Sequence, residues 1–192
     1  ALSSAASDVY KRQLANPYGS PSLEELCAGK KDIVIISSDH TRPVPSRVTM
    51  PILLHHIHSA APEARVRILV ATGMHRPSTH EELVNKYGEE IVANEEIVMH
   101  VATDDSMMKK IGTLPSGGEC IINKIAADCD LLLAEGFIEP HFFAGFSGSR
   151  KSVLPGIASY KTIMYNHNGQ FVNDSHSRAG NPVSYTHLRA HE

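Results

Sequence analysis

Residues 32–42 read Asp-Ile-Val-Ile-Ile-Ser-Ser-Asp-His-Thr-Arg, and this stretch decides the fold class. The β-branched run 32–37 follows a Gly-Lys-Lys turn, which predicts a buried strand of a parallel sheet. A polar loop, 38–45, comes directly after it. Ser46 is the expected N-cap of a helix that carries apolar side chains at helical spacing up to Ala61.

The same order of elements recurs along the chain. Residues 67–72 predict a second strand, and a Ser-Thr-His-Glu pattern at 78–81 resembles a capping box that opens a second helix. Further strands are expected at 94–101, weakly at 120–122, and strongly at 130–135. Strands that alternate with helices predict an α/β fold, a Rossmann-like parallel sheet with helices on both faces.

Composition excludes several classes of protein. The chain has 192 residues, 42% of them hydrophobic and 20% charged, which is enough for one domain with a core. A net charge of -3 without a basic block argues against nucleic acid as a partner. No apolar run reaches the roughly 18 to 20 residues that span a bilayer, and no secretory pattern opens the chain, so a cytoplasmic protein is expected.

The three cysteines, Cys27, Cys120 and Cys129, form no CxxC pair. This count and spacing argue against a disulfide framework and against a structural zinc site. Reduced thiols are therefore expected.

Both ends of the chain resemble translated sequencing adapter. Residues 8–13 are one reading frame of the transposon end GATGTGTATAAGAGACAG, and residues 183–188 are a frame of its reverse complement. We therefore expect residues 1–13 and 183–192 to be adapter, not native sequence. Residues 14–182 would then be an incomplete N-terminal catalytic and cofactor-binding domain, truncated before a second domain.

Polar loops follow three of the predicted strands, which end near Ser37, Thr72 and Glu135. Ligands of open α/β sheets bind beyond the carboxyl ends of the strands, so we expect these loops to meet in one crevice. The third loop, 136–152, adds glycines that allow close backbone approach to a ligand, and Lys151 adds positive charge.

Two common motifs fail on required residues. A nucleotide triphosphatase loop needs Gly before its Lys, and here Arg150 precedes Lys151. Residues 80–84 lack the second His of a zinc-protease HExxH motif. His100 and three histidines on the first predicted helix are expected to be structural, the three being His55, His56 and His58.

Four further residues lie in more telling contexts. His75, His141 and Lys151 fall in strand-end loops, and His167 falls in a Tyr-Asn-His-Asn-Gly stretch. Their settings resemble the lactate racemase family, whose cofactor is the nickel-pincer nucleotide. The matching motifs are Asp39-His-Thr-Arg42-Pro, Gly73-Met-His75-Arg-Pro, Glu139-Pro-His141-Phe-Phe-Ala-Gly145-Phe-Ser-Gly148-Ser-Arg-Lys151 and Asn166-His167-Asn. The resemblance covers nearly all of the non-adapter chain, and the spacing of these residues agrees with that of the family.

The resemblance implies how the cofactor is held. Lys151 would carry the pincer ring through a thioamide, because a lysine amine can form an amide-type bond and the neighbouring Arg150 cannot. His167 would be the nickel ligand, one neutral imidazole that completes a square-planar site with two sulfurs and one carbon of the cofactor. The enzymes that synthesise this cofactor are then expected partners.

The resemblance also implies the reaction, racemisation or epimerisation of a 2-hydroxy acid, lactate before others. Hydride would pass to the pincer ring and return on the other face of a 2-keto acid. His75 and His141 would be the acid/base pair, since a histidine pKa of about 6.5 lets the ring accept and donate protons near neutral pH. Asp39 and Arg42 would bind substrate, with Arg42 pairing with the carboxylate.

The family has a second domain that closes over the site and adds a lysine. Because the chain lacks it, we expect the fragment to be inactive alone, with three phenylalanines partly exposed. These are Phe142, Phe143 and Phe146.

Three alternatives stay open at this point. A paralogue acting on a longer acid or a sugar acid would keep all four residues and change only the pocket walls. A carrier for the nucleotide would need Lys151 and His167 but neither His75 nor His141. An unrelated phosphate-binding α/β protein would use residues 145–151 and never carry a pincer.

Overall fold

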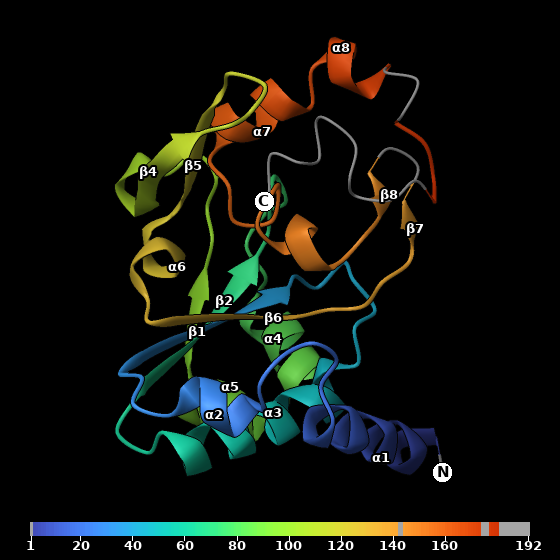
Figure 1. Cartoon of the computed structure of the whole chain (residues 1–192), viewed down its shortest axis with the longest axis vertical. Helices are drawn as coiled ribbons and strands as arrows, with labels where there is room; N and C mark the ends of the chain where they lie inside the picture. Colours follow the sequence, from blue (N-terminus) through green and yellow to red (C-terminus); the bar gives the residue numbers. More distant parts are fainter. Residues whose placement is uncertain (1, 142–143, 174–176, 181–192) are drawn as a thin grey trace.

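A four-stranded parallel sheet forms the centre of the molecule (Figure 1). The computed structural model describes residues 2–141, 144–173 and 177–180. The strand order is β3-β2-β1-β6. The bounds are Asp32–Ser38 for β1, Arg65–Ala71 for β2, Glu96–Met99 for β3 and Leu131–Glu135 for β6. The predicted α/β fold with a parallel sheet is therefore confirmed.

The chain changes direction across the sheet at β1. It runs from β1 to β2 and β3 on one side, then crosses to β6 on the other side of β1. In open α/β sheets, ligands bind where the strand order reverses in this way. The register pairs Ser37 with Glu135, so the carboxyl ends of β1 and β6 meet at this point.

Helices cover one face of the sheet (Figure 1). They are α1 (Leu2–Ala15), α2 (Leu23–Cys27), α3 (Ser46–Ala60), α4 (His80–Tyr87) and α5 (Glu89–Asn94). Ile33 and Ile35 of β1 point to this face and pack with Met50 and Ile57 of α3 in a fully buried core. Alternate side chains of β1 thus supply this layer, as the period of a strand requires.

The opposite face packs against shorter elements. These are η1 (Asp105–Met107), the hairpin of β4 (Met108–Thr113) and β5 (Glu119–Asn123), and α6 (Lys124–Asp128). Val34 and Ile36 of β1 point to this face and pack in a buried cluster with Ile122 and Ile157. Both faces of β1 are thus covered, which explains its continuous apolar run.

The remaining elements follow β6 and lie beyond the carboxyl ends of the strands. They are β7 (Pro140–His141), β8 (Gly145–Phe146), η2 (Ser149–Ser152), α7 (Tyr160–Asn166) and α8 (Gly169–Val172). In Figure 1 they occupy the side of the sheet opposite α1 to α5.

Two local predictions were wrong in detail. The N-cap of α3 is Pro45, and the hydroxyl of Ser46 turns inward to a carboxylate of β6. The predicted strand 94–101 is shorter in the structure. Helix α5 includes Asn94, and only Glu96–Met99 form strand β3. The capping box that opens α4 does exist, and it joins Thr79 to Glu82.

Other expectations have simple outcomes. All three cysteines are free thiols, as predicted. In the part of the chain that the structure describes, no helix combines the length and apolar character needed to cross a membrane. The adapter origin of residues 1–13 stays a prediction, and residues 183–192 lie outside the described residues.

Glu135 joins three elements at the switch point. Its side chain is buried, and one carboxylate oxygen accepts hydrogen bonds from Ser37 Oγ at 2.7 Å and Ser46 Oγ at 2.9 Å. Thr49 Oγ1 donates to the other oxygen. A carboxylate of β6 therefore ties together the end of β1 and the first turns of α3.

We expect Glu135→Ala to lower the free energy of unfolding by about 2–4 kcal/mol, because it leaves three inward-facing hydroxyls without their acceptor. Glu135→Gln should lower it less, since one amide oxygen still accepts. Chemical denaturation measures the change. The matched control is Glu119→Ala, which removes a partly exposed carboxylate paired with Lys110 and Lys161 and should lower the free energy of unfolding far less. Equal losses at the two sites would contradict this account of Glu135.

His100 is a second buried polar anchor, and the prediction that it is structural agrees with its contacts. Its Nε2 donates to the carbonyl of Ala158 at 2.9 Å, and Asn123 Nδ2 donates to its Nδ1 at 3.3 Å. These contacts fix the neutral tautomer. Burial lowers the pKa of His100 because the charged ring loses its hydration.

This lowered pKa makes stability depend on pH. Below about pH 6.5 the unfolded chain protonates this ring while the folded chain does not, so unfolding becomes easier as the pH falls towards the folded-state pKa. The loss from one such group is at most about 1.4 kcal/mol per pH unit. We expect His100→Gln to reduce the slope of unfolding free energy against pH between 6.5 and 5. An unchanged slope would rule out His100 as a contributor.

Candidate active site

The first strand-end loop holds a buried carboxylate against a histidine of the second loop. Asp39 is 2% exposed, and its Oδ2 lies 2.6 Å from His75 Nδ1. Its Oδ1 accepts from the backbone N–H of Thr41 at 3.1 Å and from Thr41 Oγ1 at 2.6 Å. Burial acts to raise the pKa of Asp39, but hydrogen bonds from Thr41 and His75 outweigh it and lower that pKa. The carboxylate is thus ionised and orients the imidazole.

A tight turn after β2 presents His75. The backbone N–H of His75 donates to the carbonyl of Thr72 at 2.9 Å, and Gly73 between them has a φ of +55°. Thr72 is itself fixed by its hydroxyl, which donates to the carbonyl of His100 at 2.6 Å. Because Nδ1 of His75 faces Asp39, the ring presents Nε2 for chemistry, and 46% of the side chain is exposed.

The third loop holds a histidine against a lysine. His141 pairs with Gly145 in the short β7–β8 ladder, and the N–H of Ala144 donates to His141 Nδ1 at 3.1 Å. His141 Nε2 lies 2.9 Å from Lys151 Nζ. Burial, then the positive charges of Lys151 and Arg42, lower the pKa of His141 to about 4. Burial and Arg42 lower the pKa of Lys151 to about 8.

Gly148 makes the turn that brings Lys151 back to His141. Its φ is +77°, and a Cβ there would lie 2.4 Å from the carbonyl oxygen of Phe137. Next to it, the N–H of Ser147 donates to the carbonyl of Glu139 at 2.8 Å. The loop therefore folds back on its own start, which needs glycine at this position.

His167 caps the C-terminus of α7. Its Nδ1 lies 3.1 Å from the carbonyl of Ile163 and donates to it, which places the lone pair of the neutral ring on Nε2. Burial lowers the pKa of His167, and the charge of Lys151 adds to this effect. A neutral imidazole with a fixed tautomer suits a metal ligand.

Among the described residues, no three His, Cys, Asp or Glu side chains converge to hold a metal ion. Among these described residues, His167 therefore belongs to no cluster of three such side chains.

The structure brings the predicted site residues into two contacting pairs, Asp39 with His75 and His141 with Lys151. Arg42 lies in the loop of Asp39, and its positive charge contributes to the lowered pKa of both His141 and Lys151. The charge of Lys151 in turn acts on His167. Phe146 is half-buried, whereas Phe142 and Phe143 lie outside the described residues.

Thr41 was not predicted as a site residue. It follows Asp39 by two positions, and this spacing is typical of a turn in which an Asp side chain accepts from the backbone two residues later. The sequence Asp39-His-Thr41 could therefore have predicted this contact.

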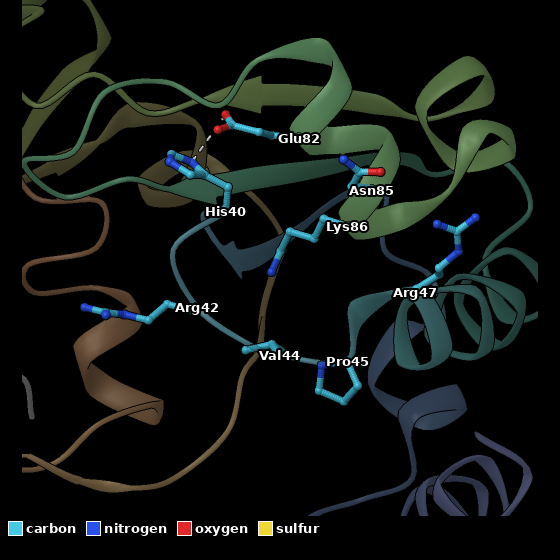
Figure 2. Close-up of a pocket in the computed structure, with 8 residues that line it drawn as sticks. All are labelled: His40, Arg42, Val44, Pro45, Arg47, Glu82, Asn85 and Lys86. Atoms are coloured by element: carbon cyan, nitrogen blue, oxygen red, sulfur yellow. Dashed lines mark ion pairs between the residues drawn. The ribbon is translucent and has the colours of Figure 1, made fainter. Parts of the chain in front are cut away.

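A cavity of about 390 Å³ adjoins the first loop (Figure 2). Lys86 and Arg42 both line it, and Figure 2 shows Arg42 pointing away from Lys86. The one carboxylate on its wall, Glu82, already forms a two-point ion pair with Arg76 at 2.6 and 2.8 Å. The crevice beside Arg42 is thus suited to an anion.

Comparisons with known proteins agree on one family. Residues 3–180 match the lactate racemase N-terminal domain family. A lactate racemase from Lactiplantibacillus plantarum is 72% identical over 174 residues, which cover 91% of this chain and 41% of that protein. A lactate racemase from Thermoanaerobacterium thermosaccharolyticum is 54% identical over 180 residues, 92% of this chain and 42% of that protein. The chain thus spans about two fifths of the length of these relatives.

Solved structures show the same likeness. The lactate racemase apoprotein from Thermoanaerobacterium thermosaccharolyticum superposes with a TM-score of 0.94 at 52% identity, over 96% of this chain and 44% of that one. A protein from Thermotoga maritima superposes with a TM-score of 0.73 at 18% identity, over 98% of this chain and 46% of that one, and shares the fold.

The turn at Gly148 can be tested with a matched pair of substitutions. Both Gly148 and Gly29 have a positive φ, so alanine is strained at either position. The added Cβ also clashes with the Phe137 carbonyl at position 148, whereas at Gly29, with a φ of +73°, it has no atom within 4 Å. We expect Gly148→Ala to lower the unfolding free energy by about 1–3 kcal/mol more than Gly29→Ala. Equal effects would mean that the loop moves away from Phe137 at little cost.

Proposed function

The chain belongs to the lactate racemase N-terminal domain family, and from this premise we propose that the full-length protein racemises or epimerises a 2-hydroxy acid, with lactate the first substrate to test. One observation carries the proposal. Two histidines lie in loops that follow strands β2 and β6 of the same parallel sheet, and each contacts its own partner, Asp39 for His75 and Lys151 for His141. Inversion of a carbon that bears a hydroxyl needs a proton partner on each face, and this arrangement offers two.

Lys151 and His167 are the residues that would hold a nickel-pincer nucleotide. The lowered pKa of the Lys151 amine suits covalent attachment, and the fixed tautomer of His167 suits one metal bond. When bound, the group would supply a hydride acceptor and donor next to the substrate. No three-residue metal cage in the described part of the chain competes with this assignment.

His75 would handle the proton of the substrate hydroxyl on one face. Asp39 holds its Nδ1–H, so Nε2 can accept a proton, and the carboxylate stabilises the charge that the ring then carries. Both oxygens of Asp39 are engaged, by His75 and by Thr41. This supports an orienting role for Asp39 over direct contact with substrate.

His141 would serve the other face, and Arg42 would bind the substrate carboxylate. The guanidinium of Arg42 is exposed and lies close enough to His141 and Lys151 to lower the pKa of both. An arginine fork binds a carboxylate through two parallel hydrogen bonds, which fixes the orientation of a small acid. A longer acid would extend into the cavity beside Lys86, so an epimerase of a larger substrate remains the second candidate.

A carrier without catalysis explains the site less well. Holding a nucleotide needs Lys151 and His167, but it gives no reason for a buried carboxylate that orients His75. Membership of the family also speaks against an unrelated phosphate-binding protein.

We expect full-length protein, made in cells that produce the cofactor, to carry a covalent adduct on Lys151 and about one nickel per chain. Lys151→Ala should abolish the adduct, whereas His167→Ala should reduce nickel and leave some adduct. Intact mass and metal analysis measure both. Arg150→Ala is the neighbouring control and should keep the adduct. Full-length protein without any added mass in competent cells would contradict the cofactor assignment.

The two histidines should divide the work between the enantiomers. Loss of a general acid or base costs about 10²- to 10⁴-fold in rate, so His75→Ala and His141→Ala should each lose racemisation in both directions. Nickel content should survive, since neither is proposed as a ligand. In single turnovers, we expect each variant to retain oxidation of one pure enantiomer to keto acid. Equal residual oxidation of both enantiomers by both variants would contradict the two-base assignment.

A further inference from the structure

The contact between His141 and Lys151 joins two nitrogen bases. Their Nε2 and Nζ atoms lie 2.9 Å apart, which is hydrogen-bond distance. One of the two nitrogens must donate and the other must accept. The identity of the donor decides whether Lys151 is an ammonium or a free amine.

The hydrogen bond of the other ring nitrogen, Nδ1, identifies the donor. Ala144 donates its backbone N–H to His141 Nδ1 at 3.1 Å, so Nδ1 carries the lone pair. The neutral ring then has its hydrogen on Nε2 and donates it to Nζ. An ammonium has three hydrogens and no lone pair, so it cannot accept this bond. The geometry is satisfied when Lys151 is a free amine.

The surroundings act in the same direction. Burial and the charge of Arg42 both lower the pKa of Lys151, to about 8. Within the described part of the chain, no carboxylate forms an ion pair with Lys151, whereas Lys109, Lys110 and Lys161 each have one. At pH 7 an amine with this pKa is unprotonated in roughly one molecule in ten, against fewer than roughly one in a thousand for an ordinary lysine.

We propose that His141 is a positioning residue for Lys151 that stabilises the free-amine form of its side chain, so that Lys151 is the reactive nucleophile of this chain towards acyl groups before any cofactor is attached. Attack of Nζ on a carboxyl or thiocarboxyl carbon forms a C–N bond, breaks the C–O bond and releases water, with no change of oxidation state. The link to cofactor attachment rests on the proposed function. The free-amine state of Lys151 is independent of it, because it is argued from the contacts of His141.

One histidine then acts twice, in sequence. An amide-type nitrogen has no basic lone pair, so acylated Lys151 no longer accepts from His141. The Nε2–H of His141 loses that acceptor and becomes available to substrate. Attachment at Lys151 thereby releases the histidine that turnover is proposed to use.

The test is site-resolved acetylation of full-length protein made without cofactor. A limiting amount of the N-hydroxysuccinimide ester of acetic acid transfers acetyl to Nζ, with loss of N-hydroxysuccinimide and release of a proton to buffer. Peptide mass spectrometry then gives the rate at each lysine from pH 6 to 10. We expect Lys151 to react at least roughly tenfold faster at pH 7 than the partly exposed Lys30, with a rate that levels off above about pH 8.

The histidine is tested by two variants. His141→Ala should slow Lys151 at pH 7 by roughly tenfold and move the rise of its rate to higher pH. His141→Gln, whose amide N–H can still donate to Nζ, should restore part of the rate. Lys86 is the internal control, since it is half-buried, has a pKa lowered by burial and donates to Ser38 Oγ rather than contacting a histidine. Its rate should be the same in all three proteins.

Two results would overturn the inference. One is a Lys151 no faster than Lys30 at pH 7, and the other is an unchanged profile in both His141 variants. The cofactor assignment fails separately. A reactive Lys151 that gains no adduct in cofactor-producing cells contradicts the proposed function alone, whereas an adduct on a Lys151 with ordinary reactivity contradicts this inference alone.

Discussion

The site depends on one buried carboxylate, that of Glu135, at the point where the sheet changes direction. Glu135 ends β6, and it binds hydroxyls from β1 and from the first turns of α3. A buried carboxylate keeps its charge only if its oxygens are hydrogen-bonded, so Ser37, Ser46 and Thr49 must stay in place. The loop between β1 and α3 therefore begins and ends on fixed atoms. That loop carries Asp39 and Arg42, and its geometry follows from this constraint.

A second set of polar anchors positions the other loops. His100 is buried between β3 and the segment before α7, and its own carbonyl accepts from Thr72, the residue that starts the turn to His75. Asp39 then reaches from the first loop to the second. The contacts of His100 and Thr72 are buried, and the Asp39 side of the Asp39–His75 pair is buried as well, so water and salt weaken them little. These buried ends fix the loops, while the exposed Arg42 adds positive charge beside them.

The sequence could predict much of the fold because β1 and β2 are apolar on both faces and alternate with helices. It could also predict that the polar loops meet, since the carboxyl ends of parallel strands share an edge. It could not predict that Ser46 turns away from the helix end, because the partner, Glu135, lies 89 residues along the chain. The contact of His141 with Lys151 depends on a two-residue ladder and on a glycine turn, neither of which has a periodic signal. The candidate residues were predicted from the resemblance to the family. Residue type alone could not distinguish a catalytic histidine from a structural one.

The two histidines differ in their partners, and this difference has a consequence for when the site works. His75 faces the anion of Asp39, whereas the half-buried His141 contacts Lys151, and burial is the main cause that lowers the pKa of His141 to about 4. A ring with that pKa is a weak base near neutral pH. Conversion of Lys151 to an amide removes the lone pair that accepts from His141 Nε2–H, so this hydrogen becomes available to substrate. If the proposed function holds, both histidines are therefore available to substrate only after attachment, because in the unloaded chain His141 is engaged by Lys151.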